Sequence, residues 1–210
     1  MSKDKNTLDW SALIAMQPSA GLIPKALREV ATQVHTDSRG TLFRIGDPVR
    51  HVYLVIDGEA RLIRLERHGG EVILQRSRGG FIAEASLDSK IYHCDAVTAE
   101  PSTLLLFPVV AFRTALENDP AFCKAWQSQL AKEVRKLRAQ CERLSLHSAA
   151  DRITHYIESE GDDGVVTLKQ SRKSWAAELG LTHEALYRAL RRMQDDGTLS
   201  IEGNQFTRKP

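Results

Sequence analysis

Two adjacent residues, His93 and Cys94, carry side chains that could bind or react with a small molecule. They lie in the stretch FIAEASLDSKIYHCDAVTAE at positions 81–100. An imidazole or a thiolate can ligate haem iron or another metal ion, and a thiol with a lowered pKa can be oxidised reversibly. Adjacent side chains on a strand point to opposite faces, so this pair cannot hold one ion together or act as base and nucleophile. Because no Gly-rich phosphate loop or paired carboxylates occur elsewhere, we expect a sensing segment and no enzyme.

A second pattern, SRKSWAAELGLTHEALYRALRRM at positions 171–193, is typical of a helix-turn-helix. Gly180 supplies the turn, Leu181 fills the angle between the helices, and Thr182 caps the second helix. The apolar stripe of the second helix consists of Ala185, Leu186, Leu190 and Met193. This spacing leaves the opposite face of the helix polar and exposed.

That polar face has the chemistry to read base pairs in the major groove. An Arg can pair bidentately with guanine O6 and N7, and a Glu can accept from cytosine N4. Residues 171–210 carry seven Lys and Arg against five Asp and Glu, and most of these cations lie where phosphate contacts are needed. A helical hairpin with a solvated face is the alternative, but the trailing hairpin LSIEGNQFTR favours a winged helix. The candidate DNA contacts are Ser171, Arg172, Thr182, His183, Glu184, Tyr187, Arg188 and Arg191.

The composition sets the cellular context that we expect for these residues. Apolar residues make up 42% and charged residues 27% of the 210 positions, values of an ordinary globular protein, and the net charge is only +2. Three cysteines with no paired spacing argue against a secreted disulfide framework. The polar N-terminus is unlike a signal peptide, and the longest apolar run, 104–112, is too short to span a bilayer. We therefore expect a cytoplasmic protein with no membrane partner.

The elements that must position these residues follow from the spacing of apolar and turn residues. Residues 1–40 predict helices, with Leu13, Leu27 and Val34 at helical spacing. Residues 40–108 predict a small antiparallel barrel or roll of short strands. Within it we expect hairpins that turn at Asp57-Gly58 and at 68–70, and a further turn near Pro101.

A long helix is predicted to begin at Asp119-Pro120, with Asp as the N-cap and Pro at the first helical position. Its apolar residues are spaced alternately by four and three, as in a two-stranded coiled coil. The dimer seam then consists of Leu130, Val134, Leu137, Cys141 and Leu144. An amphipathic helix packed on the roll is the alternative. A helix from 150, a short strand at 165–168 and the helix-turn-helix complete the chain.

In this order of elements the sequence resembles the CRP/FNR family of bacterial transcription regulators. GDPVRHVYLVIDGEARLI is similar to the family's opening strands, positions 81–100 occupy the place of its phosphate-binding cassette, and ELGLTHEALYRALRRMQDDGTLSIEG is similar to its helix-turn-helix and wing. The resemblance implies an α+β protein with an antiparallel double-stranded β-helix, a jelly-roll-like β-roll. A long dimerisation helix and a C-terminal winged helix-turn-helix follow. The implied domains are 1–118 for effector sensing, 119–148 for dimerisation and 149–210 for DNA binding.

The resemblance also implies a homodimer that binds a palindromic operator and changes its orientation on DNA when an effector binds in the roll. Glu184 and Arg188 match the family's usual base-reading positions, whereas His183 stands where the family usually has Arg. Half-sites should lie roughly 34 Å apart. RNA polymerase is a further partner if the protein activates transcription. A ligand-binding or interaction module without DNA binding is the competing function.

Nucleotide-binding members carry Gly-Glu before a short helix and then Arg-Ser or Arg-Thr. Here Glu84 matches the ribose-binding Glu, Ala83 replaces the Gly, and His93 and Cys94 replace the phosphate-binding pair. Losing the charge-assisted Arg pair should cost about 2–5 kcal/mol of binding free energy, so the sequence disfavours cyclic AMP. The candidate effector pocket comprises Phe81, Ile82, Ala83, Glu84, Ala85, His93, Cys94 and Trp126.

Four interpretations of the roll remain open from the sequence. It could bind another small anion or organic ligand, or carry haem or a metal ion on His93 or Cys94. A thiol could respond to oxidation, either Cys94 with a pKa lowered by its neighbour or Cys141 across the seam. The roll could also be packed and hold no ligand. An iron–sulfur cluster is excluded because it needs about four clustered cysteines.

Overall fold

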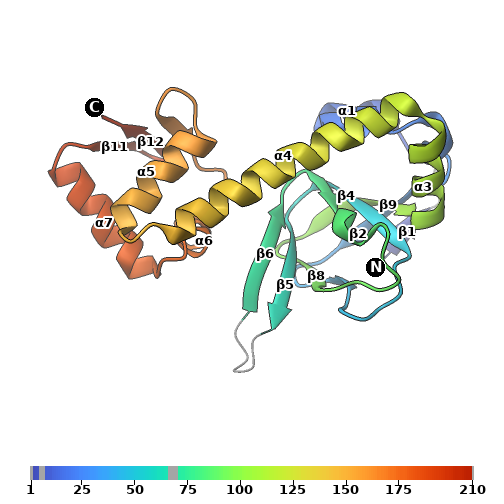
Figure 1. Cartoon of the computed structure of the whole chain (residues 1–210), viewed down its shortest axis with the longest axis horizontal. Helices are drawn as coiled ribbons and strands as arrows, with labels where there is room; N and C mark the ends of the chain where they lie inside the picture. The colour runs from blue at the N-terminus through green and yellow to red at the C-terminus, as the bar shows by residue number, and fades with distance from the viewer. Residues whose placement is uncertain (1, 5–7, 66–70, 210) are drawn as a thin grey trace. The chain divides into compact units, whose positions relative to one another are not determined.

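The computed structural model describes residues 2–4, 8–65 and 71–209 of the chain. It divides into two compact units, residues 1–127 and 128–210, coloured blue to yellow-green and yellow to red in Figure 1. The long helix α4, Pro120–Ser145, crosses the division between them. Among the helices of these residues, none is both long and apolar enough to cross a membrane. The predicted boundaries at residues 118 and 148 stay predictions.

The N-terminal unit begins with short elements, of which only some are the helices predicted for residues 1–40. They are β1 (Ser2–Asp4), α1 (Trp10–Met16), the 3-10 helix η1 (Pro18–Leu22) and α2 (Lys25–Arg28). The helical prediction is wrong from residue 32, because Thr32–Thr36 forms strand β2. Val34 and Thr36 are buried while His35 between them is exposed. This period of two is that of a half-buried strand, and it overrides the helical spacing of Val34.

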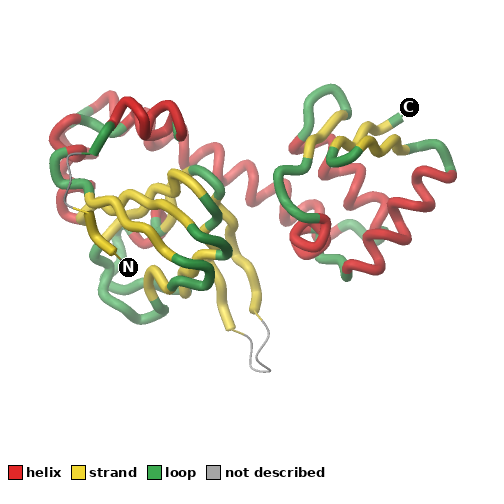
Figure 2. Tube along the Cα trace, turned by 180° about the vertical axis from the view of Figure 1, so that it is seen from behind, coloured by secondary structure: helices red, strands yellow, loops and turns green. Residues whose placement is uncertain are grey.

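Two antiparallel sheets form the roll that the sequence predicts, and Figure 2 shows their strands in yellow. One sheet has the order β1-β2-β9-β4-β7 and the other β3-β8-β5-β6. The strands after β2 are β3 (Thr41–Phe43), β4 (His51–Asp57), β5 (Ala60–Leu65), β6 (Glu71–Ser77), β7 (Gly80–Ile82), β8 (Asp95–Thr98) and β9 (Ser102–Pro108). Strands far apart in sequence pair here, as in the match of Tyr53 with Leu106.

The turn at Asp57-Gly58 exists, but the predicted hairpin between its flanking strands is wrong. Strand β4 pairs with β7 and β9, whereas β5 pairs with β6 and β8 in the other sheet. Gly58 has a φ of +84°, and a Cβ added there would lie 2.6 Å from the Pro101 carbonyl oxygen. Glycine is therefore required where the chain passes between sheets. The turn near Pro101 likewise joins β8 and β9 of different sheets.

The second predicted hairpin is confirmed in its strands, because β5 and β6 pair with Leu65 opposite Glu71. Its turn at His68-Gly69-Gly70 lies outside the described residues. The short 3-10 helix η2 (Glu84–Ser86) follows β7, and α3 (Val109–Asn118) follows β9. The predicted start of the long helix is confirmed, since Asp119 Oδ1 accepts from the Phe122 backbone N–H at 2.9 Å.

The C-terminal unit contains the winged helix-turn-helix that the sequence predicts. Helices α5 (Ala149–Glu160), α6 (Arg172–Glu178) and α7 (His183–Asp195) pack with the sheet β10-β12-β11. Its strands are β10 (Val165–Thr167), β11 (Leu199–Glu202) and β12 (Gln205–Arg208). Trp175, Leu186 and Phe206 are fully buried in its core, so α6, α7 and the wing share one packed interior.

Candidate functional site

The turn between α6 and α7 is built as the sequence predicts. Thr182 Oγ1 accepts from the Ala185 backbone N–H at 3.1 Å, and Ser171 Oγ caps α6 in the same way at 3.2 Å from Ser174 N. Gly180 has a φ of +63°, a left-handed conformation that disfavours a side chain. These caps fix where both helices begin and hence which face of α7 is buried.

Helix α7 has the two faces that its spacing predicts. Leu186, Leu190 and Met193 are buried and Ala185 is half-buried. The exposed side chains of the opposite face are His183, Glu184, Tyr187, Arg188 and Arg191. Neither Arg188 nor Arg191 makes a side-chain hydrogen bond or ion pair within the described part of the chain. Their guanidinium groups are therefore not committed to contacts inside the fold.

The first turn of α7 holds Glu184 in its ionised form. Its own backbone N–H and the Thr182 hydroxyl lower the pKa of the Glu184 carboxyl, and His183 and Arg188 lower it further. A carboxylate at a helix N-terminus is stabilised in this way. Glu184 can therefore act as a hydrogen-bond acceptor at neutral pH.

Arg172 makes more contacts within the fold than the sequence indicates. Its Nη2 donates to the Gly203 carbonyl in the β11–β12 turn at 3.2 Å. Its guanidinium also lies 5.6 Å from the ring centroids of both Tyr187 and Phe206. These are long-range contacts that helical spacing cannot reveal. Arg172 thus stabilises the packing of the wing on α7, beside the contact with a DNA phosphate that the sequence predicts for it.

Two arginines join the C-terminal end of α4 to the rest of this unit. Arg143 is only 1% exposed. Its Nη2 donates to Ser159 Oγ and Glu160 Oε1, both at 3.2 Å, and its guanidinium lies 4.6 Å from the Tyr156 ring centroid. An arginine is rarely buried unless it is paired, so these contacts stabilise the end of α4 against α5.

Arg152 makes the reverse connection, from α5 back to the end of α4. It donates to the Leu144 and Leu146 carbonyls at 3.2 and 2.9 Å, and to the Leu179 and Gly180 carbonyls at 3.1 and 3.0 Å. One side chain therefore satisfies carbonyls at a helix end and in the turn before α7. Neither arginine lies in a local motif, so the sequence does not indicate the role of either one.

The predicted seam residues form a stripe on the surface of α4. Val134, Leu137 and Leu144 are 45%, 47% and 43% exposed, Cys141 is exposed, and Leu130 is half-buried. Exposed large apolar side chains repeated along one helix face are typical of a surface that another chain covers. In the single chain this stripe is exposed to solvent.

Within the cassette, the nominated effector residues fall into two groups. Phe81, Ile82 and Ala83 are buried in the roll, whereas Glu84 is half-buried and Ala85 is exposed. Ala83 adopts a φ of +71°, a left-handed conformation that costs about 1–2 kcal/mol for a residue with a Cβ. The chain therefore keeps a backbone turn suited to glycine although it has alanine there.

His93 and Cys94 differ sharply in their surroundings. They lie in a bend just before β8, not on the strand itself, but their side chains still diverge: His93 is exposed and Cys94 is 4% exposed. His93 Nδ1 lies 3.3 Å from Ser86 Oγ. Burial raises the pKa of the Cys94 thiol, so the expectation of a lowered pKa was wrong.

Trp126 packs inside the N-terminal unit. It is buried, and its ring meets Phe81 and Phe112 edge-on, with centroids 4.9 and 4.8 Å apart. No group of three or more His, Cys, Asp or Glu side chains that could hold a metal ion occurs among the residues described. A role for Trp126 in lining an effector pocket stays a prediction.

Comparison with known proteins identifies one domain family and several similar regulators. The cyclic nucleotide-binding domain family matches residues 34–119. The CRP-like protein Clp of Xanthomonas oryzae pv. oryzae is 24% identical over 221 residues, covering 97% of this chain and 96% of that protein. A global nitrogen regulator of Synechococcus elongatus is 24% identical over 190 residues, covering 83% and 85%. FixK2 from Bradyrhizobium japonicum has a similar fold, with a TM-score of 0.66, 22% identity, and coverage of 86% and 93%. Residues 34–119 therefore match a cyclic nucleotide-binding domain, and along most of its length the chain is similar to a CRP-like protein.

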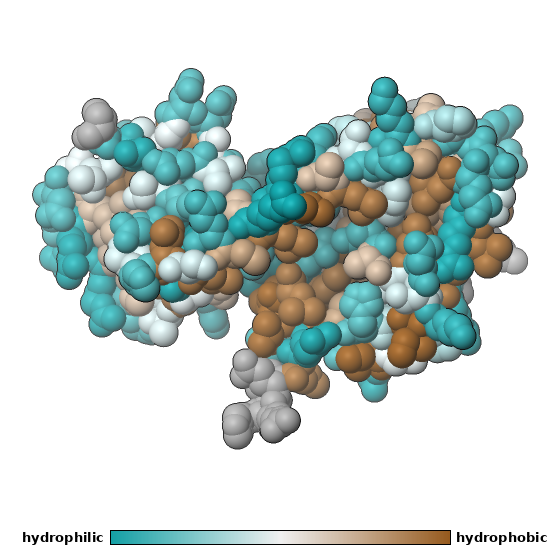
Figure 3. Space-filling model, in the orientation of Figure 1, coloured by the Kyte–Doolittle hydropathy of each residue, from teal (hydrophilic) through white to brown (hydrophobic). Residues whose placement is uncertain are grey.

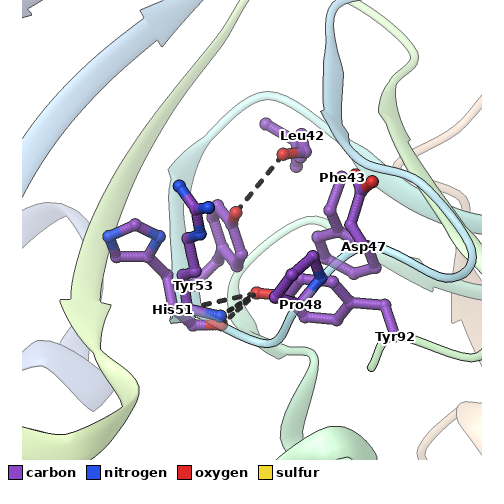
Figure 4. Close-up of a pocket in the computed structure, with 8 residues that line it drawn as sticks. Leu42, Phe43, Asp47, Pro48, His51, Tyr53 and Tyr92 are labelled. Atoms are coloured by element: carbon purple, nitrogen blue, oxygen red, sulfur yellow. Dashed lines mark hydrogen bonds between the residues drawn. The ribbon is translucent and has the colours of Figure 1, made fainter. Parts of the chain in front are cut away.

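The roll contains a cavity that no pattern in the sequence indicates. It measures about 320 Å³ and is lined by Leu42, Phe43, Asp47, Pro48, Arg50, His51, Tyr53 and Tyr92. Figure 4 shows the Tyr53 hydroxyl donating to the Leu42 carbonyl at 3.3 Å. None of the eight nominated effector residues lines it. Tyr92 stacks on Phe43, with ring centroids 3.8 Å apart. Among the lining residues, Tyr92 lies within the cassette at positions 81–100, and this is the only feature of the sequence that points to the cavity.

The roll also has apolar side chains on its surface. Figure 3 shows apolar surface over β5 and β6, where Leu65, Val72 and Leu74 are exposed. Strand β6 is an edge strand of its sheet. Exposed apolar side chains on an edge strand favour contact with another surface.

Proposed function

We propose that this protein is a homodimeric regulator that acts in the cytoplasm, binds a palindromic site in double-stranded DNA through α7, and responds to an effector in its roll. One observation carries the DNA-binding part: α7 buries Leu186, Leu190 and Met193 and turns its charged face outward. A helix with this division, capped at its start by Thr182, suits insertion into the major groove.

Each exposed residue of α7 has a separate role in the proposal. Arg188 donates to guanine, and the ionised Glu184 accepts from cytosine N4. His183 lies against the Tyr187 ring, with centroids 4.6 Å apart and ring planes tilted by 57°, so these two side chains form one continuous contact surface beside the bases. Since His183 cannot form the bidentate fork of an arginine, the operator differs from the family's usual half-site.

The heptad positions on α4 support a parallel two-stranded dimer. Val134 and Cys141 take the a positions, and Leu137 and Leu144 the d positions; a β-branched residue at a with Leu at d favours two parallel helices. Glu133 and Arg138 then take g and e positions five residues apart, which is the spacing of an ion pair between parallel helices. With two-fold symmetry, each copy presents one α7 to one half-site.

The effector that we propose is not cyclic AMP. The cassette has no arginine at the position of His93, whose ring is exposed and contacts Ser86. Cys94 beside it is buried and offers a thiol, which is a weaker hydrogen-bond donor than the family's hydroxyl. A neutral imidazole provides one donor and no fixed charge, so it does not replace a guanidinium.

The test of DNA binding is selection of bound sequences from a random double-stranded library, followed by affinity measurement for the site that is enriched. We expect a palindrome with half-sites roughly 34 Å apart. Arg188→Ala should weaken the free energy of binding to this site by about 1–3 kcal/mol and relax discrimination at one base of each half-site. Lys209→Ala, which removes a cation outside α7, is the control and should leave base discrimination unchanged. If no sequence is enriched, the protein is a ligand-binding or interaction module instead.

A further inference from the structure

Strand β5 brings one arginine close to the cassette. In the β5–β8 pairing, Ala60 lies opposite Thr98 and Leu62 opposite Ala96, and all four side chains are buried. Arg64 lies two residues beyond Leu62, at the end of the strand where the side chains become exposed. The register continued by one residue beyond Ile63 and Asp95 places Arg64 beside Cys94.

The contacts of Arg64 confirm that it reaches the cassette. Its Nη2 donates to the His93 carbonyl at 2.8 Å. Arg64 is exposed, and it forms no ion pair with a carboxylate anywhere in residues 2–4, 8–65 and 71–209. A guanidinium has five N–H donors, so this single hydrogen bond leaves most of them available.

The side chains around Arg64 define what it could bind. Burial raises the pKa of the Cys94 thiol most; Arg64 lowers it, and Asp95 and Glu84 raise it. The charges of all three residues therefore act at one place. Asp95 Oδ1 is already hydrogen-bonded to the Ile45 backbone N–H at 2.8 Å. His93, whose carbonyl Arg64 contacts, is exposed, and its Nδ1 lies 3.3 Å from Ser86 Oγ.

We propose that Arg64 is the anion-binding residue of the effector site, and that it takes a small organic anion through a phosphate or carboxylate group. The positive charge comes from strand β5, not from the cassette position that His93 occupies. The anion site stands on the contacts above; its role as effector site rests on the proposed function.

This site is separate from the cavity of about 320 Å³, because Arg64 is not among the residues that line that cavity. The cavity contains its own arginine, Arg50, which is exposed like Arg64. Arg50 therefore provides a matched control within the same unit: an exposed arginine of the roll at a different position.

The test uses the full-length protein and two simple probes, inorganic phosphate and acetate, titrated at constant ionic strength and pH 8. The readout is the His93 imidazole signal in NMR spectra, assigned by its loss in His93→Asn. We expect a saturable shift with at least one probe, about ten- to one-hundred-fold weaker binding in Arg64→Gln, and unchanged binding in Arg50→Gln. Arg64→Lys should keep part of the affinity, because it keeps the charge without the fork.

Three results would overturn the proposal: no saturable shift in the wild-type protein, equal affinity in Arg64→Gln, or equal losses in Arg64→Gln and Arg50→Gln. A response to phosphate alone identifies phosphate esters as the ligand class, and a response to acetate alone identifies carboxylates. Sequence-specific DNA binding is measured separately by selection. If it persists while the anion test fails, only this inference is lost; if anions bind but no DNA is selected, the proposed function fails while the site remains.

Discussion

Truncating Leu137 tests the dimer seam most directly. Its side chain is 47% exposed in the single chain. Full burial of a leucine contributes about 1.5–3 kcal/mol, so covering the exposed half in a dimer contributes about 0.7–1.4 kcal/mol per copy. Two copies meet in a symmetric dimer, which doubles this to about 1.4–2.8 kcal/mol. Leu137→Ala should therefore raise the dimer dissociation constant about ten- to one-hundred-fold.

The measurement is sedimentation equilibrium over a range of protein concentrations, with unfolding followed on the same samples. Leu22→Ala is the matched control. Leu22 is 44% exposed but lies in η1 and not on α4, so its truncation should leave the dimer dissociation constant unchanged. Equal effects of the two substitutions would refute the seam. If instead α4 packs on its own chain as an amphipathic helix, Leu137→Ala would lower the free energy of unfolding without changing the dissociation constant.

Three further outcomes follow from the geometry. Oxidation with diamide should link two chains through Cys141, seen on a non-reducing gel in Cys123→Ser but absent in Cys141→Ser; a dimer that never cross-links would contradict the parallel register. Arg143→Met should lower the free energy of unfolding of the C-terminal unit by about 1.5–3 kcal/mol in urea titrations, because Glu160, which is 30% exposed, loses a charge-assisted hydrogen bond; a change below about 0.5 kcal/mol would show that the pair is dispensable. Glu59→Gln should lower the free energy of unfolding by about 2–3 kcal/mol at pH 7, and by progressively less below about pH 4.3. The pKa of Glu59 is lowered in the folded protein, so its stabilising contribution is lost as acid protonates the carboxylate. A difference in unfolding free energy that does not change with pH would contradict this.

The Glu59 effect has a specific electrostatic origin. The carboxylate is fully buried, which by itself raises its pKa, but hydrogen bonding from Arg61 and the charges of Arg61, Arg78 and Arg76 outweigh the burial and lower it. Arg76 Nη1 lies 3.2 Å and Arg78 Nη2 2.6 Å from the carboxylate oxygens. Since the three arginines are partly exposed, Glu59→Gln should lower the free energy of unfolding less than the loss of a fully buried ion pair would.

The helix-turn-helix could be predicted from the sequence because its determinants are local. Gly180, Thr182 and the stripe from Leu186 to Met193 lie within a few turns, and each constrains the backbone or the buried face by itself. The β-roll was predicted as a class but not in its pairing. Asp57-Gly58 is a strong turn signal, yet a turn says nothing about which strands pair after it, and here the chain changes sheets. Pairing of β4 with β9 depends on residues about fifty positions apart, which no local pattern encodes.

The same distinction explains why the sequence reveals only part of the anion site that we propose. His93 stands in a contiguous cassette at the position of the family's arginine, so the sequence by itself indicates that this positive charge is missing. Arg64 comes close to His93 only because β5 pairs with β8, and no local pattern links two residues 29 positions apart. Ala83 adds a physical argument that the cassette still has a role. Its left-handed backbone is unfavourable by about 1–2 kcal/mol, and such strain persists where the surrounding structure holds it, often at binding sites. A strained turn in the same cassette that Arg64 contacts favours a site with changed ligand chemistry over a roll that binds nothing.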